Sequence, residues 1–279
     1  MAHPHHHHHD HEDLATPRDP ERRAPVRHQL GRRRFLTDVG RGTFAVTIFG
    51  ASVIACSNED ESGRSSERDG AEPDSSTSSE APSEPVSWHR VHLGFVSAYV
   101  LVRGRGAAIV DSGIAGSEAA IAQTLTDLGV GWADVDHVML THFHPDHAGS
   151  VPAVLEAAEA ATAYAGEADI PAIESPRPLQ AVGDGDEVFG LQIVATPGHT
   201  PGHISVLDPD GGFLVAGDAL TADAGGLAGP TPQFTADLEL AHDSVRRLAD
   251  LRFADVLVGH GDPIEGDGDA QVVALAARL

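Results

Sequence analysis

The chain has 279 residues, of which 41% are hydrophobic and 22% charged, and its formal net charge at pH 7 is −24. So acidic a chain, with no lysine at any position, excludes nucleic acid as an expected partner, because phosphate binding needs a basic surface. Cys56 is the only cysteine, which excludes an intramolecular disulfide.

Residues 1–56 have the composition of a tail followed by an export signal. The histidine run at 5–9 is interpreted as a purification tag or solvated tail, in preference to a metal-gathering arm. Arginines at 32–34, followed by Phe-Leu, resemble a twin-arginine signal, and the largely uncharged stretch at 42–55 fits a signal-peptide core. Residues 53–56 resemble a bacterial lipobox. We therefore expect export and a lipid anchor on Cys56 at the outer face of a membrane, or otherwise secretion.

A linker and one folded domain are expected after the signal. Residues 57–87 are rich in Ser, Glu, Asp and Pro, and nine acids against two arginines give them a net charge of −7. Such a segment cannot bury enough apolar surface to order itself, so it reads as a flexible tether. Residues 88–279 carry the apolar patterns of a domain, with 27 acids and 8 arginines. We interpret that acidity as an adaptation to solubility or salt.

The apolar patterns of residues 88–279 alternate between strand and helix. The predicted strands lie at 91–95, 97–102, 107–110, 135–140, 191–195, 203–207, 213–216 and 256–258. The predicted helices lie at 118–128, 151–160 and 236–248, the last with Thr235 as its cap. The turn sequence at 208–212 predicts a hairpin. This order indicates the α/β class.

Seven potential metal ligands each follow a short apolar strand. Four lie in one loop after the strand at 135–140, and three lie downstream: His142, His144, Asp146, His147, His199, Asp218 and His260. Imidazole and carboxylate suit zinc and the neighbouring transition metals. Ionisable groups crowded together need a charge that offsets their desolvation and repulsion. Seven such groups are enough for two metal ions.

The ligand pattern resembles that of the metallo-β-lactamase fold superfamily, whose H-x-H-x-D-H motif is complete at 142–147. The resemblance covers about residues 88–279. It implies an αββα four-layer sandwich with metals at one edge. It further implies two ligand sets joined by one bridging carboxylate: His142, His144 and His199 for one metal, Asp146, His147 and His260 for the other, and Asp218 as the bridge.

The metal set is similar to those of glyoxalase II and lactonases within that superfamily. The resemblance implies two Zn²⁺ per chain and a metal-bridging hydroxide that attacks a small-molecule ester, thioester or lactone. Asp146 is expected to shuttle a proton as well as bind metal. The Gly- and Pro-rich loop at 221–234 is expected to shape the pocket mouth, and its single charge favours a weakly charged or apolar acyl substrate.

Two other functions stay open at this stage. One is a persulfide dioxygenase with a single Fe²⁺ on the same scaffold, although His147 and His260 favour two metals. The other is a non-catalytic, surface metal-binding lipoprotein.

Residues beside the ligands have less certain roles. Asp111 either orients a ligand histidine or caps a turn. Thr141 and Thr200 adjoin ligands and could bond within the site, whereas His203 is expected to stay outside it.

Overall fold

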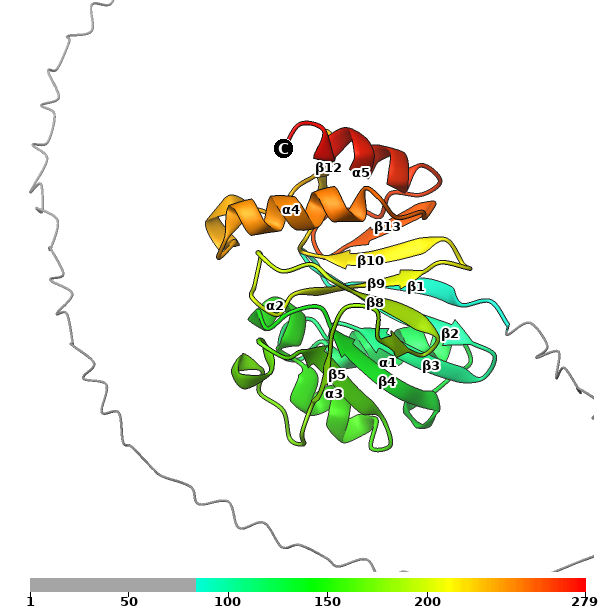
Figure 1. Cartoon of the computed structure of the whole chain (residues 1–279). Helices are drawn as coiled ribbons and strands as arrows, with labels where there is room; N and C mark the ends of the chain where they lie inside the picture. Colours follow the sequence, from blue (N-terminus) through cyan, green and yellow to red (C-terminus); the bar gives the residue numbers. More distant parts are fainter. Residues whose placement is uncertain (1–83) are drawn as a thin grey trace, which may run out of the picture. The chain divides into compact units, whose positions relative to one another are not determined.

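The computed structural model describes residues 84–279. The predicted export signal, the histidine run at 5–9, Cys56 and nearly all of the linker lie outside them. The described residues form four layers in the order helix, sheet, sheet, helix (Figure 1). This confirms the predicted α/β class and αββα sandwich. Between residues 84 and 279, no helix has both the length and the apolar character needed to cross a membrane.

The first sheet contains six strands in chain order. They are β1 (Ser87–His92), β2 (Ser97–Arg103), β3 (Gly106–Val110), β4 (Val135–Leu140), β5 (Thr162–Gly166) and β6 (Gln180–Val182). The strands β1 to β3 pair antiparallel, and β3 to β6 pair parallel. Parallel neighbours need crossover connections, and these carry α1 (Glu118–Asp127), η1 (Trp132–Asp134), α2 (Pro145–Ala148), α3 (Val151–Ala157) and η2 (Ile170–Ala172).

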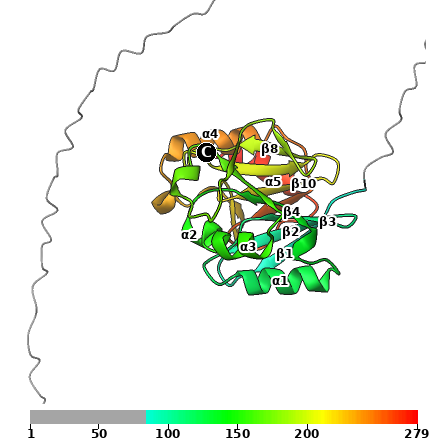
Figure 2. The ribbon, with the colours of Figure 1, turned by 90° about the horizontal axis from the view of Figure 1, so that it is seen from below.

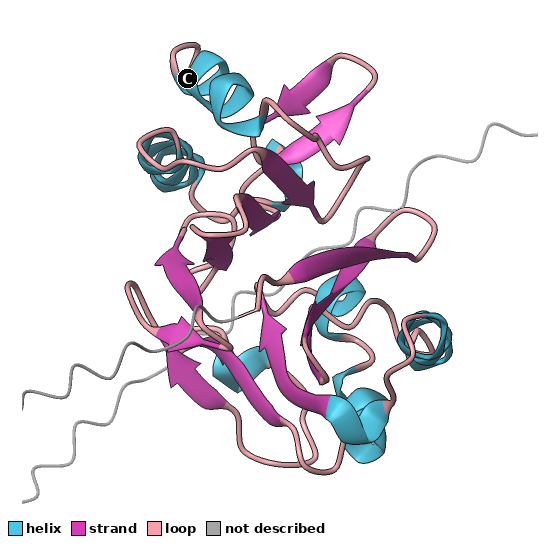
Figure 3. Ribbon diagram, turned by 90° about the vertical axis from the view of Figure 1, so that its right-hand side faces the viewer, coloured by secondary structure: helices cyan, strands magenta, loops and turns pink. Residues whose placement is uncertain are grey.

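The second sheet has the strand order β13-β10-β9-β8-β7. Its members are β7 (Glu187–Val188), β8 (Leu191–Ala195), β9 (Ile204–Asp208), β10 (Phe213–Gly217) and β13 (Asp255–Val258). The predicted hairpin at 208–212 joins β9 to β10. A small hairpin and three helical segments complete the layer: β11 (Thr221–Asp223), β12 (Gly226–Ala228), η3 (Pro232–Phe234), α4 (Leu238–Leu248) and α5 (Gly268–Ala276). The helices lie at the outside of the sandwich (Figures 2 and 3).

Alternating side chains divide the apolar interior into three cores. In β2, Val100 packs in the core shared with α1 and α3, whereas Leu101 packs between the two sheets. In β8, Ile193 faces the core between the sheets, and Val194 faces the core shared with α4 and α5. Because successive side chains of a strand point to opposite faces, strands covered on both faces read as continuous apolar runs.

Several predicted boundaries were wrong. The first strand ends at His92 instead of 95, because the chain turns at Gly94, which has a positive φ of 87°. The helix predicted at 151–160 ends at Ala157. The helix predicted at 236–248 begins at Leu238, and its cap is Asp237 instead of Thr235. The Asp237 carboxylate accepts the Leu240 N–H, and the Thr235 hydroxyl instead contacts the ring of His199.

Candidate metal centre

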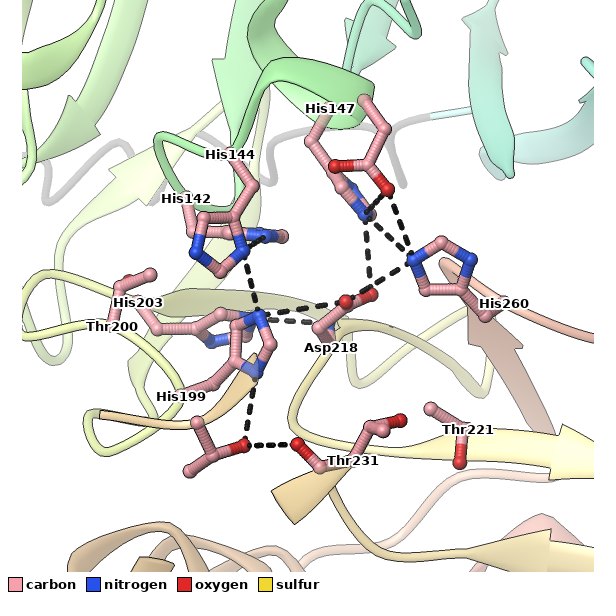
Figure 4. A network of polar contacts seen from close by, with 12 residues as sticks. His142, His144, His147, His199, Thr200, His203, Asp218, Thr221, Thr231 and His260 are labelled. Carbon is pink, nitrogen blue, oxygen red and sulfur yellow. Dashed lines mark hydrogen bonds and ion pairs between the residues drawn. The ribbon is translucent and has the colours of Figure 1, made fainter. Parts of the chain in front are cut away.

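The seven predicted ligands converge at one edge of the sandwich. Figure 4 labels all of them except Asp146. Four come from the first sheet, from the loop and short helix α2 that follow β4. Three come from the second sheet, after β8, β10 and β13. Strand ends therefore deliver every one of these side chains, as the sequence predicted.

One group consists of three histidines whose ring nitrogens face each other. His144 Nδ1 lies 3.0 Å from His142 Nε2 and 3.0 Å from His199 Nε2. His142 and His199 are buried, and His144 is half-buried. This is the predicted first ligand set.

A second group contains Asp146, His147 and His260. The Nε2 atoms of His147 and His260 are 3.4 Å apart, and Asp146 Oδ2 lies 3.3 Å from His260 Nε2. The Asp218 carboxylate lies between the groups. Its Oδ1 is 3.2 Å from His147 Nε2, and its Oδ2 is 3.5 Å from His199 Nε2. The structure thus places Asp218 in contact with both predicted sets.

The outward ring nitrogens of four histidines each have an acceptor. These contacts are His142 Nδ1 with Thr141 Oγ1 (3.0 Å), His147 Nδ1 with Asp111 Oδ2 (2.8 Å), His199 Nδ1 with Thr235 Oγ1 (3.3 Å) and His260 Nδ1 with the Phe95 carbonyl (2.8 Å). The hydroxyl protons of Thr141 and Thr235 are donated elsewhere, to Asp111 and to the Thr231 carbonyl. Each threonine oxygen can therefore accept the imidazole proton, which leaves Nε2 as an unprotonated lone pair directed inward.

This arrangement fits bound metal. Lone pairs of neutral imidazoles 3.0 Å apart repel one another unless a cation lies among them. Asp218 Oδ1 is buried and, apart from the ion-pair contact with His147 Nε2 at 3.2 Å, has no hydrogen-bond partner among the described residues. Gly259 keeps the space open, because a Cβ there would lie 2.5 Å from His147 Cε1. Nitrogen and carboxylate donors, with no sulfur, suit zinc or iron.

Asp111 orients a ligand histidine, which is one of its two predicted roles. Its carboxylate is buried and accepts hydrogen bonds from His147 Nδ1 and from both the backbone N–H and the hydroxyl of Thr141. Asp111 has a positive φ of 63°, which residues other than glycine rarely adopt. Such strain next to ligands indicates that the surrounding contacts determine this backbone conformation.

The loop that carries His199 is held by a residue that the sequence analysis missed. The buried Asp169 carboxylate accepts the Thr200 hydroxyl at 2.6 Å and the Gly202 N–H at 2.7 Å. On the other side of the loop, Gly198 packs against the backbone of Ala241 with a φ of 127°. Thr200 therefore does not contact a ligand side chain through its hydroxyl. It donates to Asp169, which supports the loop that carries His199.

His203 contradicts its expected place outside the site. Its ring is completely buried, with its centroid 5.2 Å from that of His142. Burial lowers the pKa of His203 to about 3, so the ring is neutral. Nδ1 contacts Thr196 Oγ1 at 2.8 Å, and Nε2 accepts the Asp218 N–H at 3.0 Å. His203 thus fixes the backbone of Asp218 from behind. In the sequence, only the spacing of four residues between His199 and His203 could have indicated that His203 lies beside the ligands.

Residues 92–260 match the family model of the metallo-beta-lactamase superfamily. The chain belongs to this superfamily. It is 33% identical to metallo-beta-lactamase domain-containing protein 1 of Xenopus laevis over 67% of this chain and 84% of that protein. It is 37% identical to hydroxyacylglutathione hydrolase of Ectopseudomonas mendocina (strain ymp) over 53% of each chain. This chain therefore spans only about half the length of that hydrolase.

A solved structure gives a further comparison. TTHA1623, in a di-iron-bound form, is 26% identical with a TM-score of 0.55, and the likeness covers 69% of this chain and 97% of that one. The metallo-beta-lactamase superfamily contains metal-dependent hydrolases, and this chain is an enzyme of that kind.

The two ligand groups differ in their affinity for protons. Burial lowers the pKa of His199 to about 4. At His147, burial opposes protonation, but the carboxylates of Asp218 and Asp111 outweigh it and raise the pKa well above 6.5. Hydrogen bonds to Asp146 and Asp218 raise the pKa of His260 to about 10. Without metal, the second group therefore holds protons where a metal would bind.

We expect the metal-free protein to be most stable near pH 6.5. Below that pH the unfolded chain binds more protons than the folded one at His199 and His203, so stability falls toward pH 4. His260 contributes stability below its unfolded pKa, and that contribution is lost as the pH rises through about 10. Urea unfolding of chelator-treated protein at pH 5, 6.5 and 9 measures this profile. A steady increase in stability from pH 5 to pH 9 would contradict it.

Replacing Asp169 with asparagine is expected to weaken binding at the first ligand set by about 10-fold, because the single amide oxygen can accept from only one of the two donors, the Thr200 hydroxyl and the Gly202 N–H. Stepwise zinc affinities from chelator competition measure the change. Asp208→Asn is the matched control, because Asp208 is also buried and accepts backbone N–H groups, in the β9–β10 turn. An equal loss of zinc affinity at the two ligand sets would argue against the idea that Asp169 supports only the loop that carries His199.

Proposed function

We propose that the chain is a dinuclear zinc hydrolase that cleaves an ester, thioester or lactone. The convergence of two ligand groups on the Asp218 carboxylate carries this proposal. His142, His144 and His199 would hold one metal, and Asp146, His147 and His260 the other, with Asp218 between them. When bound, such a metal pair supplies an activated water near neutral pH and polarises a carbonyl group.

Asp146 is the proposed proton acceptor. Without metal, a hydrogen bond from His260 lowers the pKa of Asp146. With metal on His260, the Asp146 carboxylate would be the group that accepts a proton from the attacking water. Unlike Asp218, it is partly exposed, with 27% of its side chain accessible against 9% for Asp218. Asp146 can therefore exchange the proton with solvent or with the leaving group, whereas Asp218 is enclosed by histidines.

The relatives support hydrolysis of an acyl compound. Hydroxyacylglutathione hydrolase, by its name, cleaves an acyl conjugate of glutathione, and it is 37% identical to this chain over 152 residues. The match covers 53% of that enzyme, so its substrate does not transfer with the family. The similarity therefore supports attack on an acyl carbon, but not a particular substrate.

Iron is the second candidate for the metal. TTHA1623 was solved with two irons on a similar scaffold. A persulfide dioxygenase would need one iron held by two histidines and an aspartate, which is three donors, whereas this chain brings seven together at one place. The second ligand group therefore favours the two-metal hydrolase over the one-iron oxygenase. The convergence of buried and half-buried donors below the surface favours it over a non-catalytic, surface metal-binding lipoprotein.

Elemental analysis of the full chain, purified without added metal, tests the proposal. Because the histidines at 5–9 offer imidazoles of their own, the double variant His144→Ala/His260→Ala provides the background to subtract. A difference of about two zincs per chain is expected, together with loss of ester hydrolysis in the variant. A difference of one iron, with oxygen consumption on a persulfide, would replace this proposal by the oxygenase.

Export and anchoring form a separate part of the proposal. The arginines at 32–34 and the lipobox-like residues 53–56 support an extracytoplasmic protein with a lipid on Cys56. Mass spectrometry of the mature N-terminus measures this directly. A Cys56→Ala variant is expected to leave the membrane fraction, and unchanged membrane association would count against the anchor.

A further inference from the structure

A cavity of about 490 Å³ opens over the ligand groups. Half of its lining consists of residues assigned to the metal centre, and the other half is neutral: Phe95, Pro145, Thr231 and Phe234. Thr231 and Phe234 come from the loop at 221–234 that was predicted to shape the mouth. Phe95 comes from the turn between β1 and β2, on the other sheet. The neutral half is the part of the cavity that can recognise a substrate.

Two exposed phenylalanines flank this cavity. Phe95 is 62% exposed and Phe234 is 64% exposed, although most large apolar side chains of the described residues are buried. The ring of Phe95 is held in place, because it stacks on His260 with centroids 6.1 Å apart and an interplanar angle of 6°. The Phe95 carbonyl also accepts the His260 Nδ1–H. A rigid exposed aromatic face beside the reacting groups offers an apolar binding surface.

No arginine lines this cavity, and its neutral half offers no charge partner for a carboxylate that lies away from the metal centre. Arg90 lines a second cavity that shares Phe95 with this one. All three nitrogens of its guanidinium are already engaged, with Ser97 Oγ, Asp262 and the Gly261 carbonyl at 2.7–2.8 Å. Placing a carboxylate against phenylalanine without a partner is costly.

We propose that the substrate is an ester, thioester or lactone with a neutral alkyl or aryl acyl group, and that acyl compounds with a carboxylate remote from the scissile bond are rejected. This rests on the proposed hydrolysis. Water adds to the acyl carbon, the bond to the leaving oxygen or sulfur breaks, and the proton passes to the leaving atom, giving an acid and an alcohol or thiol. Glutathione conjugates, which carry two carboxylates, fall in the rejected class.

Two matched esters test this substrate class on the metal-loaded full chain. The 4-nitrophenyl ester of 6-methylheptanoic acid is neutral, and the mono-4-nitrophenyl ester of adipic acid has a carboxylate in place of the isopropyl group. We expect kcat/KM to be about 100-fold higher for the neutral ester. The ratio is read from kcat/KM because that quantity is unaffected by unproductive binding of the carboxylate to metal. A ratio near one, or below it, would overturn the proposal.

Variants of the exposed side chains assign the selectivity to the cavity. Phe234→Ala is expected to lower kcat/KM for the neutral ester about 10-fold and to change that for the adipate ester less than about 2-fold. Val273→Ala is the control, because Val273 is exposed on α5 and does not line the cavity. Equal losses for the two esters in Phe234→Ala would remove that residue from substrate recognition and overturn its part of the proposal.

A binding measurement separates failure of this inference from failure of the proposed hydrolysis. The anilide of 6-methylheptanoic acid is a neutral, slowly cleaved analogue whose affinity can be followed by calorimetry. If neither ester is cleaved, but the anilide binds and Phe234→Ala weakens it about 10-fold, the hydrolase proposal fails and the recognition proposal stands. If the anilide binds equally well to the wild type and to Phe234→Ala, the recognition proposal fails whatever the activity.

Discussion

Replacing Asp218 with asparagine is expected to lower the rate of ester hydrolysis by on the order of 10²–10³-fold, because one carboxylate serves both ligand groups. Its oxygens lie 3.2–3.5 Å from the Nε2 atoms of His147, His199 and His260. A neutral amide would not offset the charges of two adjacent metals, and it has only one oxygen that could bind a metal. Metal content and kcat of the purified variant measure the effect, and both are expected to fall together.

The matched comparison is Asp146→Asn. Asp146 contacts His147 and His260, with Oδ2–Nε2 distances of 3.9 Å and 3.3 Å, and belongs to the second group only. This variant is expected to keep one metal per chain at the three-histidine group. If Asp218→Asn kept two metals and lost only turnover, Asp218 would act on the substrate instead of between the metals.

Replacing Asp111 with asparagine is expected to weaken metal binding about 10- to 100-fold without direct contact with the metal. The carboxylate now accepts the His147 Nδ1–H at 2.8 Å and the Thr141 N–H at 2.8 Å. In the variant, the amide oxygen can serve only one of these donors. If it serves Thr141, the amide N–H₂ faces His147 and stabilises the tautomer that carries its proton on Nε2, where the metal would bind.

The tautomer distinguishes this prediction from simple unfolding. Nitrogen-15 NMR of His147 in the metal-free protein reports which ring nitrogens carry a proton. The raised pKa predicts protons on both nitrogens in the wild type, and the folded asparagine variant is expected to lose the Nδ1 proton and keep the proton on Nε2. Asp208→Asn again serves as the control for loss of a buried carboxylate away from the site. An unchanged tautomer together with unchanged metal affinity would show that Asp111 only caps its turn.

The sequence was most informative where a residue's neighbours in the chain determine its environment. The strands at Val135–Leu140 and Leu191–Ala195 were predicted without error, because continuous apolar runs bounded by polar residues are typical of strands covered on both faces. The strand Thr162–Gly166 was missed, because alanine and glycine are weak strand formers and only its pairing with β4 and β6 defines it.

The ligands were predictable because their spacing is itself the signal, whereas their supporting residues are defined by contacts across the fold. Asp169 is 31 residues from Thr200, and Phe95 is 165 residues from His260. Thr235 illustrates the same limit. Its position before a helix suggested a cap, which is a local role, but in the structure it contacts His199 at a sequence separation of 36. Tertiary packing thus decides which of two suitable polar residues caps α4.

Each ligand group draws two members from the loop after β4 and a third from the other sheet. His142 and His144 meet His199, while Asp146 and His147 meet His260. Metal ions at these positions would therefore cross-link two halves of the domain, in addition to the apolar core between the sheets and hydrogen bonds such as that from Thr200 to Asp169. Resistance to unfolding then becomes a function of free metal concentration, with a gain of about 2.7 kcal/mol at one hundred times the dissociation constant of one site. At low free metal concentration, the contact between the two sheets would lose stability before the strand pairing within either sheet did.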